Sequence, residues 1–170
     1  MAGLWCRAPF DYALCAPLRT SGRARLSSGM NAPLYTTEIL RLAATLPAPR
    51  ELERVDGSSE QRSPTCGSTV RLQVQLGDDG RVAAISQQVQ ACAFGQASAS
   101  LLDKGATHRS TDEIARAVDD LTSWLAGDRD TPGDWPGLEA LAPARSRKSR
   151  HGAILLPFKA LLVAMKEERP

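Results

Sequence analysis

Alternating apolar and polar positions predict a β-hairpin at the centre of the chain. Every second residue from 70 to 76 is apolar, and the residues between them are arginine or glutamine. This period of two is typical of a strand with one buried face and one wet face. The next five residues, "GDDGR", favour a tight turn. A return strand is expected over about 82–90, and a short edge strand around 52–56 would complete an antiparallel meander.

Apolar positions spaced three and four residues apart predict helices on both sides of the hairpin. The expected helices cover residues 35–46, 92–105, 110–127 and 151–167. Ser110 and Glu113 form the S-x-x-E pattern of a capping box. Pro157 should lie in the first turns of the last helix, where a missing N–H costs least. These elements predict an α+β fold, an antiparallel three-stranded sheet with helices packed on one face.

Composition and charge narrow the classes of function. The 170 residues suit one domain with a hydrophobic core, and 21 basic side chains against 19 acidic ones argue against a dedicated nucleic-acid binder. No apolar run reaches the roughly 20 residues of a membrane span, so we expect a cytoplasmic protein. The basic run "RSRKSR" (145–150) is interpreted as a solvated loop, with docking of an acidic partner as the alternative.

Residues 1–29 differ from the rest of the chain. They hold four arginines and a single acid, Asp11, without a sustained period. We expect a disordered N-terminal extension upstream of Met30 as the working start, and a folded domain over 30–170. An organelle transit peptide is the less favoured alternative, since arginine and serine are present and acids are scarce.

Two of the four cysteines flank the predicted hairpin. Four cysteines in 170 residues are too few for a disulfide-stapled scaffold. Because a hairpin returns the chain to its starting point, Cys66 before it and Cys92 after it should lie close together. Cys92 is also expected at a helix N-terminus, where the dipole stabilises a thiolate. A lone cysteine is often a small buried apolar residue, but the shared topology favours a paired thiol site.

The same residues resemble a known family. The stretch "PTCGSTVRLQVQLGDDGRVAAISQQVQACAFGQASASLL" (64–102) resembles the U-type iron–sulfur cluster assembly scaffolds, the family of IscU, SufU and the N-terminal domain of NifU. That family has a Cys-Gly pair before a strand, a D-x-G hairpin, and a cysteine before an A-S-S/A-S helix start. Here Cys66-Gly67, Asp78-Asp79-Gly80 and Cys92 stand at those places, and the likeness extends over residues 32–166.

The resemblance implies a scaffold or carrier and not an enzyme. Such proteins receive sulfur from a cysteine desulfurase, assemble a labile cluster, usually [2Fe–2S], and pass it to apo iron–sulfur proteins. Thiolates suit this chemistry because sulfide-bridged iron prefers soft ligands. The expected ligands of the iron or cluster are Cys66 and Cys92. The alternatives are a zinc-binding or sulfur-accepting accessory of a desulfurase, and a dithiol redox protein, which the absence of C-x-x-C weakens.

The chain departs from the family at two expected ligands. The aspartate after Cys-Gly is replaced by Ser68, and the third cysteine, which is associated with accepting sulfur, falls on Gly152 or Ala153. His151 could offer a neutral nitrogen to the metal, although a lone histidine before a helix is more often a cap or a surface residue. Either a homodimer shares one cluster between its cysteines, or one protomer adds His151 and an exogenous thiol.

Overall fold

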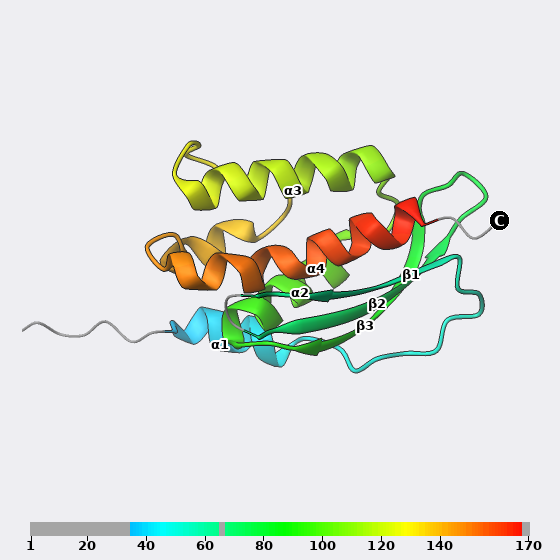
Figure 1. Ribbon diagram of the computed structural model, residues 1–170, viewed down its shortest axis with the longest axis horizontal. Helices are drawn as coiled ribbons and strands as arrows, with labels where there is room; N and C mark the ends of the chain where they lie inside the picture. The colour runs from blue at the N-terminus through cyan, green and yellow to red at the C-terminus, as the bar shows by residue number, and fades with distance from the viewer. Residues whose placement is uncertain (1–34, 65–66, 168–170) are drawn as a thin grey trace, which may run out of the picture. The chain divides into compact units, whose positions relative to one another are not determined.

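The computed structural model describes residues 35–64 and 67–167. The predictions for residues 1–29, and the position of Cys66, lie outside these residues. The elements are α1 (Thr37–Ala44), β1 (Gly57–Arg62), β2 (Thr69–Leu76), β3 (Val82–Gln90), α2 (Ala93–Gly105), α3 (Thr111–Ala126), the short 3-10 helix η1 (Leu138–Ala144) and α4 (Lys148–Lys166) (Figure 1).

The strands form one antiparallel sheet in the order β1–β2–β3. Arg62, the last residue of β1, pairs with Thr69, and Thr69 pairs with Gln90, the last residue of β3. The end of β1, the start of β2 and the end of β3 therefore lie side by side at one end of the sheet. The turn between β2 and β3 lies at the opposite end (Figure 1).

The edge strand lies later in the chain than the sequence predicts. β1 begins at Gly57, directly after the expected 52–56. The Asp56 carboxylate holds the end of the connecting segment beside β2. It accepts hydrogen bonds from the Leu76 N–H at 2.7 Å and from Arg54 at 2.6 Å. Only a glycine fits at the start of β1, since a Cβ on Gly57 would lie 1.9 Å from the Ala164 carbonyl oxygen.

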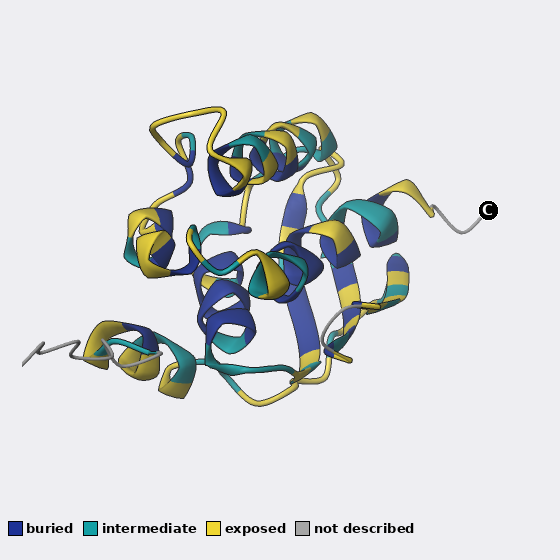
Figure 2. Cartoon of the chain, turned by 60° about the vertical axis from the view of Figure 1, so that its left-hand side comes forward, coloured by how far each residue is buried: buried dark blue, intermediate teal, exposed yellow. Residues whose placement is uncertain are grey.

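The helices cover one face of the sheet, as the sequence predicts. α4 packs on β1 and β2, α2 packs beside β3, and α3 lies over α4 farther from the sheet (Figure 1). The inward faces are buried, as the dark blue segments of Figure 2 show. The largest fully buried side chains are those of Phe94, Phe158, Ile39, Leu72, Leu102, Ile114, Leu121, Leu138, Leu141, Ile154, Leu161 and Val70. Among the described residues, no helix is long and apolar enough to cross a membrane.

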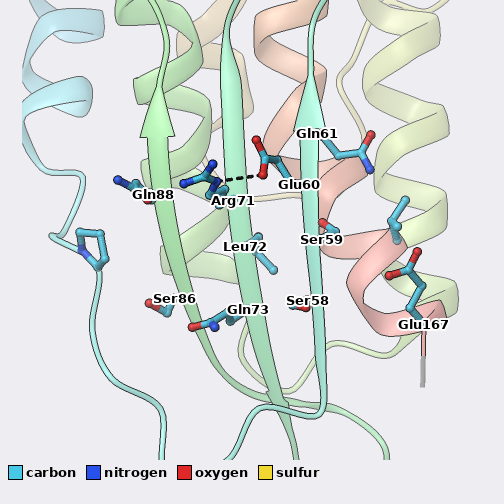
Figure 3. Close-up of a pocket in the computed structure, with 12 residues that line it drawn as sticks. Ser58, Ser59, Glu60, Gln61, Arg71, Leu72, Gln73, Ser86, Gln88 and Glu167 are labelled. Carbon is cyan, nitrogen blue, oxygen red and sulfur yellow. Dashed lines mark hydrogen bonds and ion pairs between the residues drawn. The ribbon is translucent and has the colours of Figure 1, made fainter. Parts of the chain in front are cut away.

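The other face of the sheet is polar. Ser58, Gln73 and Ser86 form one row across the three strands (Figure 3). A second row contains Arg71, whose Nε donates to Glu60 at 2.9 Å. The side chains on this face are therefore polar, whereas those on the helix-covered face belong to the hydrophobic core.

α4 starts earlier than predicted. It begins at Lys148, so Pro157 lies in the interior of the helix and not in its first turns. The proline has no N–H for the carbonyl of Ala153, and that carbonyl lies against α2, 3.1 Å from where a Cβ on Gly95 would stand. The neighbouring Ile154 carbonyl accepts from the Ser98 hydroxyl at 2.6 Å. Close packing on α2 therefore accommodates a proline inside this helix.

The capping box at the start of α3 is confirmed. Ser110 Oγ accepts from the Glu113 N–H at 3.3 Å, and a Glu113 carboxylate oxygen accepts from the Ser110 N–H at 2.9 Å. Hydrogen bonds that the Glu113 carboxylate accepts from the Ser110 backbone N–H and from the Ser110 hydroxyl, together with Arg81, lower the pKa of Glu113 to about 2.

Glu113→Gln is expected to destabilise the protein near neutral pH and to matter progressively less in acid. The pKa of this carboxylate is lower in the folded chain than its ordinary value of 4.5. Its stabilising effect is therefore complete above about pH 4.5 and is lost as the pH falls towards 2. Denaturant unfolding of both proteins across this range tests it, with the exposed Glu53→Gln as control. An unfolding difference that stays constant down to pH 2 would rule the explanation out.

Candidate thiol site

Four parts of the chain meet at the end of the sheet where β1 and β3 end. They are Tyr35, residues 63–64 and 67–68, Cys92 before α2, and the first turns of α4, and we call this region the thiol end. A Cβ on Gly152 of α4 would lie 2.7 Å from Ser63 Oγ, and a Cβ on Gly95 of α2 would lie 3.4 Å from the Ala153 Cβ. The first turns of α2 and α4 and the residue Ser63 therefore lie close together.

Backbone hydrogen bonds join Ser63 to Gly67 and Ser68. The Ser63 N–H donates to the Ser68 carbonyl at 2.9 Å, and the Gly67 N–H donates to the Ser63 carbonyl at 3.1 Å. Gly67 has a φ of +68°, which favours glycine at this position. Ser68, which stands where the family has an aspartate, is buried. Ser63 and Ser68, which stand on either side of Cys66 in the sequence, therefore lie side by side.

Pairing of the flanking residues supports the predicted proximity of the two thiols. Thr69, three positions after Cys66, pairs with Gln90, two positions before Cys92. Cys66 lies outside the described residues, so its distance to Cys92 stays a prediction. The topology on which that prediction depends is the one observed.

Cys92 is the N-cap residue of α2, as the sequence predicts for a thiol at a helix start. Its backbone is extended, with φ −66° and ψ 168°, and its side chain makes no capping hydrogen bond. The thiol is free and half-buried. No acidic residue lies in the first turn of α2. The positive end of the α2 dipole therefore lies beside the sulfur without a local carboxylate.

Sequence reasoning missed three residues near Cys92. Burial first, and then the charge and hydrogen-bonding of the nearby Cys92 thiol, raise the pKa of Tyr35. Arg150 and Arg147 lie close enough to Tyr35 to act on its pKa in the opposite direction. The Tyr35 ring also packs on Phe94, with centroids 5.0 Å apart. The sequence carried no sign of this cluster, because its parts lie far apart along the chain.

The structure places His151 beside the thiol end with one ring nitrogen already engaged. His151 Nε2 lies 3.1 Å from both the Ala144 and the Arg145 carbonyl oxygens. Carbonyl oxygens only accept hydrogen bonds, so Nε2 carries the hydrogen. Of the two ring nitrogens, Nδ1 alone has a lone pair to offer a metal.

The two candidate positions of the missing cysteine point in different directions. Ala153 is fully buried and packs against Gly95 of α2. A side chain at Gly152 would instead point at Ser63 in the loop that precedes β2. Space therefore favours Gly152 as the position facing the site, a choice that the sequence left open.

Within residues 35–64 and 67–167, no group of three or more histidine, cysteine or acidic side chains is arranged to hold a metal. Cys92 and His151 are the predicted ligands that fall in these ranges. A complete ligand set would need a donor from outside the described residues, such as Cys66, or from a second copy of the chain.

Comparison with known proteins adds an independent line of evidence. The family model described as the NifU-like N terminal domain matches residues 35–127. A crystal structure of a nitrogen-fixing NifU-like protein (N-terminal) from Brucella abortus is 29% identical, with a TM-score of 0.72 over 78% of this chain and 92% of that chain. Comparison with curated proteins found no match.

A second solved structure shares the fold. It comes from Fervidobacterium islandicum AW-1 and is described as an iron–sulfur cluster assembly scaffold protein for the SUF system. It is 18% identical, with a TM-score of 0.67 over 78% of this chain and 96% of that chain. The family match includes the positions of both Cys66 and Cys92, whereas α4 lies beyond it. The chain therefore belongs to the NifU-like N-terminal domain family of iron–sulfur cluster assembly scaffolds.

Proposed function

We propose that this protein binds iron or a [2Fe–2S] cluster at the thiol end and passes it to apo iron–sulfur proteins. The pairing of Thr69 with Gln90 carries the proposal, because it brings together the segments that flank Cys66 and Cys92. Membership of the scaffold family supports the class of cargo. Residues 30–170 form the working domain, and a cysteine desulfurase supplies the sulfur. We place these steps in the cytoplasm.

Cys66 and Cys92 are the proposed ligands. Their thiolates are the soft donors that iron in a sulfide-bridged cluster prefers. A [2Fe–2S] cluster takes four such ligands, so two protomers that each give both cysteines complete the set. The alternative is one protomer that adds His151 and an exogenous thiol, since Nδ1 keeps its lone pair while Nε2 donates to two backbone carbonyls.

Anaerobic reconstitution tests the proposal. The full-length protein is mixed with ferrous iron, cysteine and a cysteine desulfurase, and its visible spectrum is recorded beside iron and acid-labile sulfide contents. A coloured protein with equal iron and sulfide supports the proposal, and elution as a dimer supports the bridging cluster. A colourless protein with background iron contradicts it.

A zinc-binding or sulfur-accepting accessory of a desulfurase is the second candidate. Glycine at position 152 favours it, because no third thiol stands on α4 where the family's cysteine would face the loop. This function predicts zinc binding without visible absorption, together with faster desulfurase turnover. Zinc titration and a sulfide-release assay with the same protein distinguish it from the scaffold.

A further inference from the structure

The two edges of the sheet differ in how they are covered. At the β3 edge, the Arg50 side chain reaches the strand, and its Nε donates to the Ile85 carbonyl at 2.7 Å. At the β1 edge, no backbone–backbone hydrogen bond among the described residues joins Ser58, Glu60 or Arg62 to a segment outside the sheet. Within the described part of the chain, β1 is therefore the uncovered edge.

The pairing of β1 with β2 shows which backbone groups face this edge. The Ser63 N–H donates to the Ser68 carbonyl, just beyond the end of β1. Hydrogen-bonded residues alternate along an antiparallel strand, so the odd-numbered residues of β1 bond to β2. The even-numbered ones, Ser58, Glu60 and Arg62, direct their N–H and C=O groups outward. Such a row is a template on which another strand can pair.

β1 lacks the features that usually keep an edge strand from pairing. Its six residues include no proline or lysine, and its register with β2 has no shift. A groove of about 490 Å³ reaches the strand, and its lining includes residues 58–61 together with Val163 and Glu167 of α4. Glu167 lies beside Ser58 at the start of β1, and Gln61 lies farther from that helix turn (Figure 3). The second half of β1 is therefore the more accessible half.

The charges of β1 are self-complementary in one register. Glu60 accepts from Arg71 at 2.9 Å, whereas the exposed Arg62 forms no ion pair with a described carboxylate. Two antiparallel β1 strands centred on Gln61 would place Glu60 of each copy opposite the partner's Arg62. Centring the pair on Glu60 or on Arg62 would instead place like charges opposite each other, which is unfavourable.

We propose that two copies of this chain pair through β1, antiparallel and centred on Gln61, into one continuous sheet with three strands from each copy. The outward backbone groups of the two strands exchange hydrogen bonds, and the two Glu60–Arg62 pairs select the register. The contact is isologous, because the same patch serves both copies. It goes beyond the proposed function and does not depend on it.

This contact differs from the cluster-bridged dimer. The thiol end lies beyond Arg62 in each copy, and antiparallel strands run in opposite directions, so the two thiol ends point away from each other. A single short strand makes a small contact, and small interfaces are weak and transient. The edge dimer should therefore form at high protein concentration and dissociate on dilution, whereas a shared cluster would hold its dimer together.

Charge reversal tests the register on iron-free, reduced full-length protein. Sedimentation velocity over a range of protein concentrations measures the dissociation constant of the wild-type dimer. Arg62→Glu and Glu60→Arg are each expected to raise this constant about tenfold or more, because two like-charge pairs replace two attractive ones. An equal mixture of the two variants should recover the association, since each acid then faces an arginine again.

Arg116→Glu is the matched control, because it makes the same charge change at an exposed position of α3. It should associate like wild type. The exposed Glu60–Arg71 pair contributes little to folding, so both β1 variants should fold, and their melting curves check this. Amide hydrogen exchange is the second readout: the N–H groups of Glu60 and Arg62 should exchange more slowly as the dimer forms.

Wild-type protein that stays monomeric at the highest concentration would overturn the proposal. A dimer that Arg62→Glu leaves intact, or a mixture that fails to associate, would overturn it too, as would unchanged exchange at Glu60 and Arg62. All of these measurements are made without iron. Their failure would therefore leave the proposed cluster function standing, and a failed reconstitution would leave the edge dimer standing.

Discussion

Cys92→Ala should remove nearly all of the iron that the protein holds after anaerobic reconstitution, and Cys66→Ala should do the same. Loss of a hydrogen-bond partner outside the ligand shell already costs a metal site about 10–100-fold in affinity. Loss of a ligand should cost more. The bridged dimer sharpens the expectation, because one substitution removes two of the four ligands at once. Iron and sulfide per chain, measured after desalting, give the result.

Cys6→Ala and Cys15→Ala are the matched controls for this prediction. Both change the same residue type within residues 1–29, and both should keep the wild-type iron content. Cys92→Ala protein that still binds iron and sulfide at the wild-type ratio would show that the cluster lies elsewhere. Each variant's melting curve separates lost binding from lost folding.

Gly152→Cys should slow the loss of a bound cluster, and Ala153→Cys should not. A side chain at position 152 points at the loop before β2, where Ser63 Oγ would lie 2.7 Å from the new Cβ and must move slightly. Ala153 is fully buried against α2, so a thiol there would crowd Gly95. A third thiolate on the same chain binds at high effective concentration, and we expect release slower by about tenfold or more.

Decay of the visible absorption after addition of an iron chelator measures this effect. Gly152→Ser is a further control, because it adds a side chain of similar size in the same place without a thiol. Faster release from Gly152→Cys than from wild type would contradict the geometry of the thiol end. Equal slowing in Ala153→Cys would contradict it too.

Local sequence patterns predicted the hairpin and the capping box because both arise from short-range chemistry. Thr69–Leu76 alternates strictly, and Ser110 reaches only as far as Glu113. β1 was misplaced because its residues, "GSSEQR", have no apolar alternation. Its pairing is set by β2 and by the fit of Gly57 against α4, which are tertiary effects. The predicted start of the last helix, at His151, is too late because the basic residues before it show no apolar stripe.

The candidate site likewise combines features that short-range patterns predict with features that depend on tertiary contacts. Cys92 could be placed from the sequence because it stands between a strand and a helix with clear patterns. The nearness of Tyr35 to Cys92, Arg147 and Arg150 depends on α1 and α4 both packing against α2. The backbone contacts of His151 Nε2 arise from the turn between η1 and α4. No sequence pattern predicts such contacts, because they join segments that lie far apart along the chain.

Transfer of a cluster to an apo-ferredoxin tests the central claim most directly. The reconstituted protein is mixed anaerobically with apo-ferredoxin and a chelator that captures free iron, and circular dichroism follows the appearance of the holo-ferredoxin spectrum. A carrier predicts direct transfer, with the ferredoxin gaining its cluster at a rate that the chelator does not change. If the chelator takes the iron and the ferredoxin stays apo, the protein does not pass clusters on and the account is wrong.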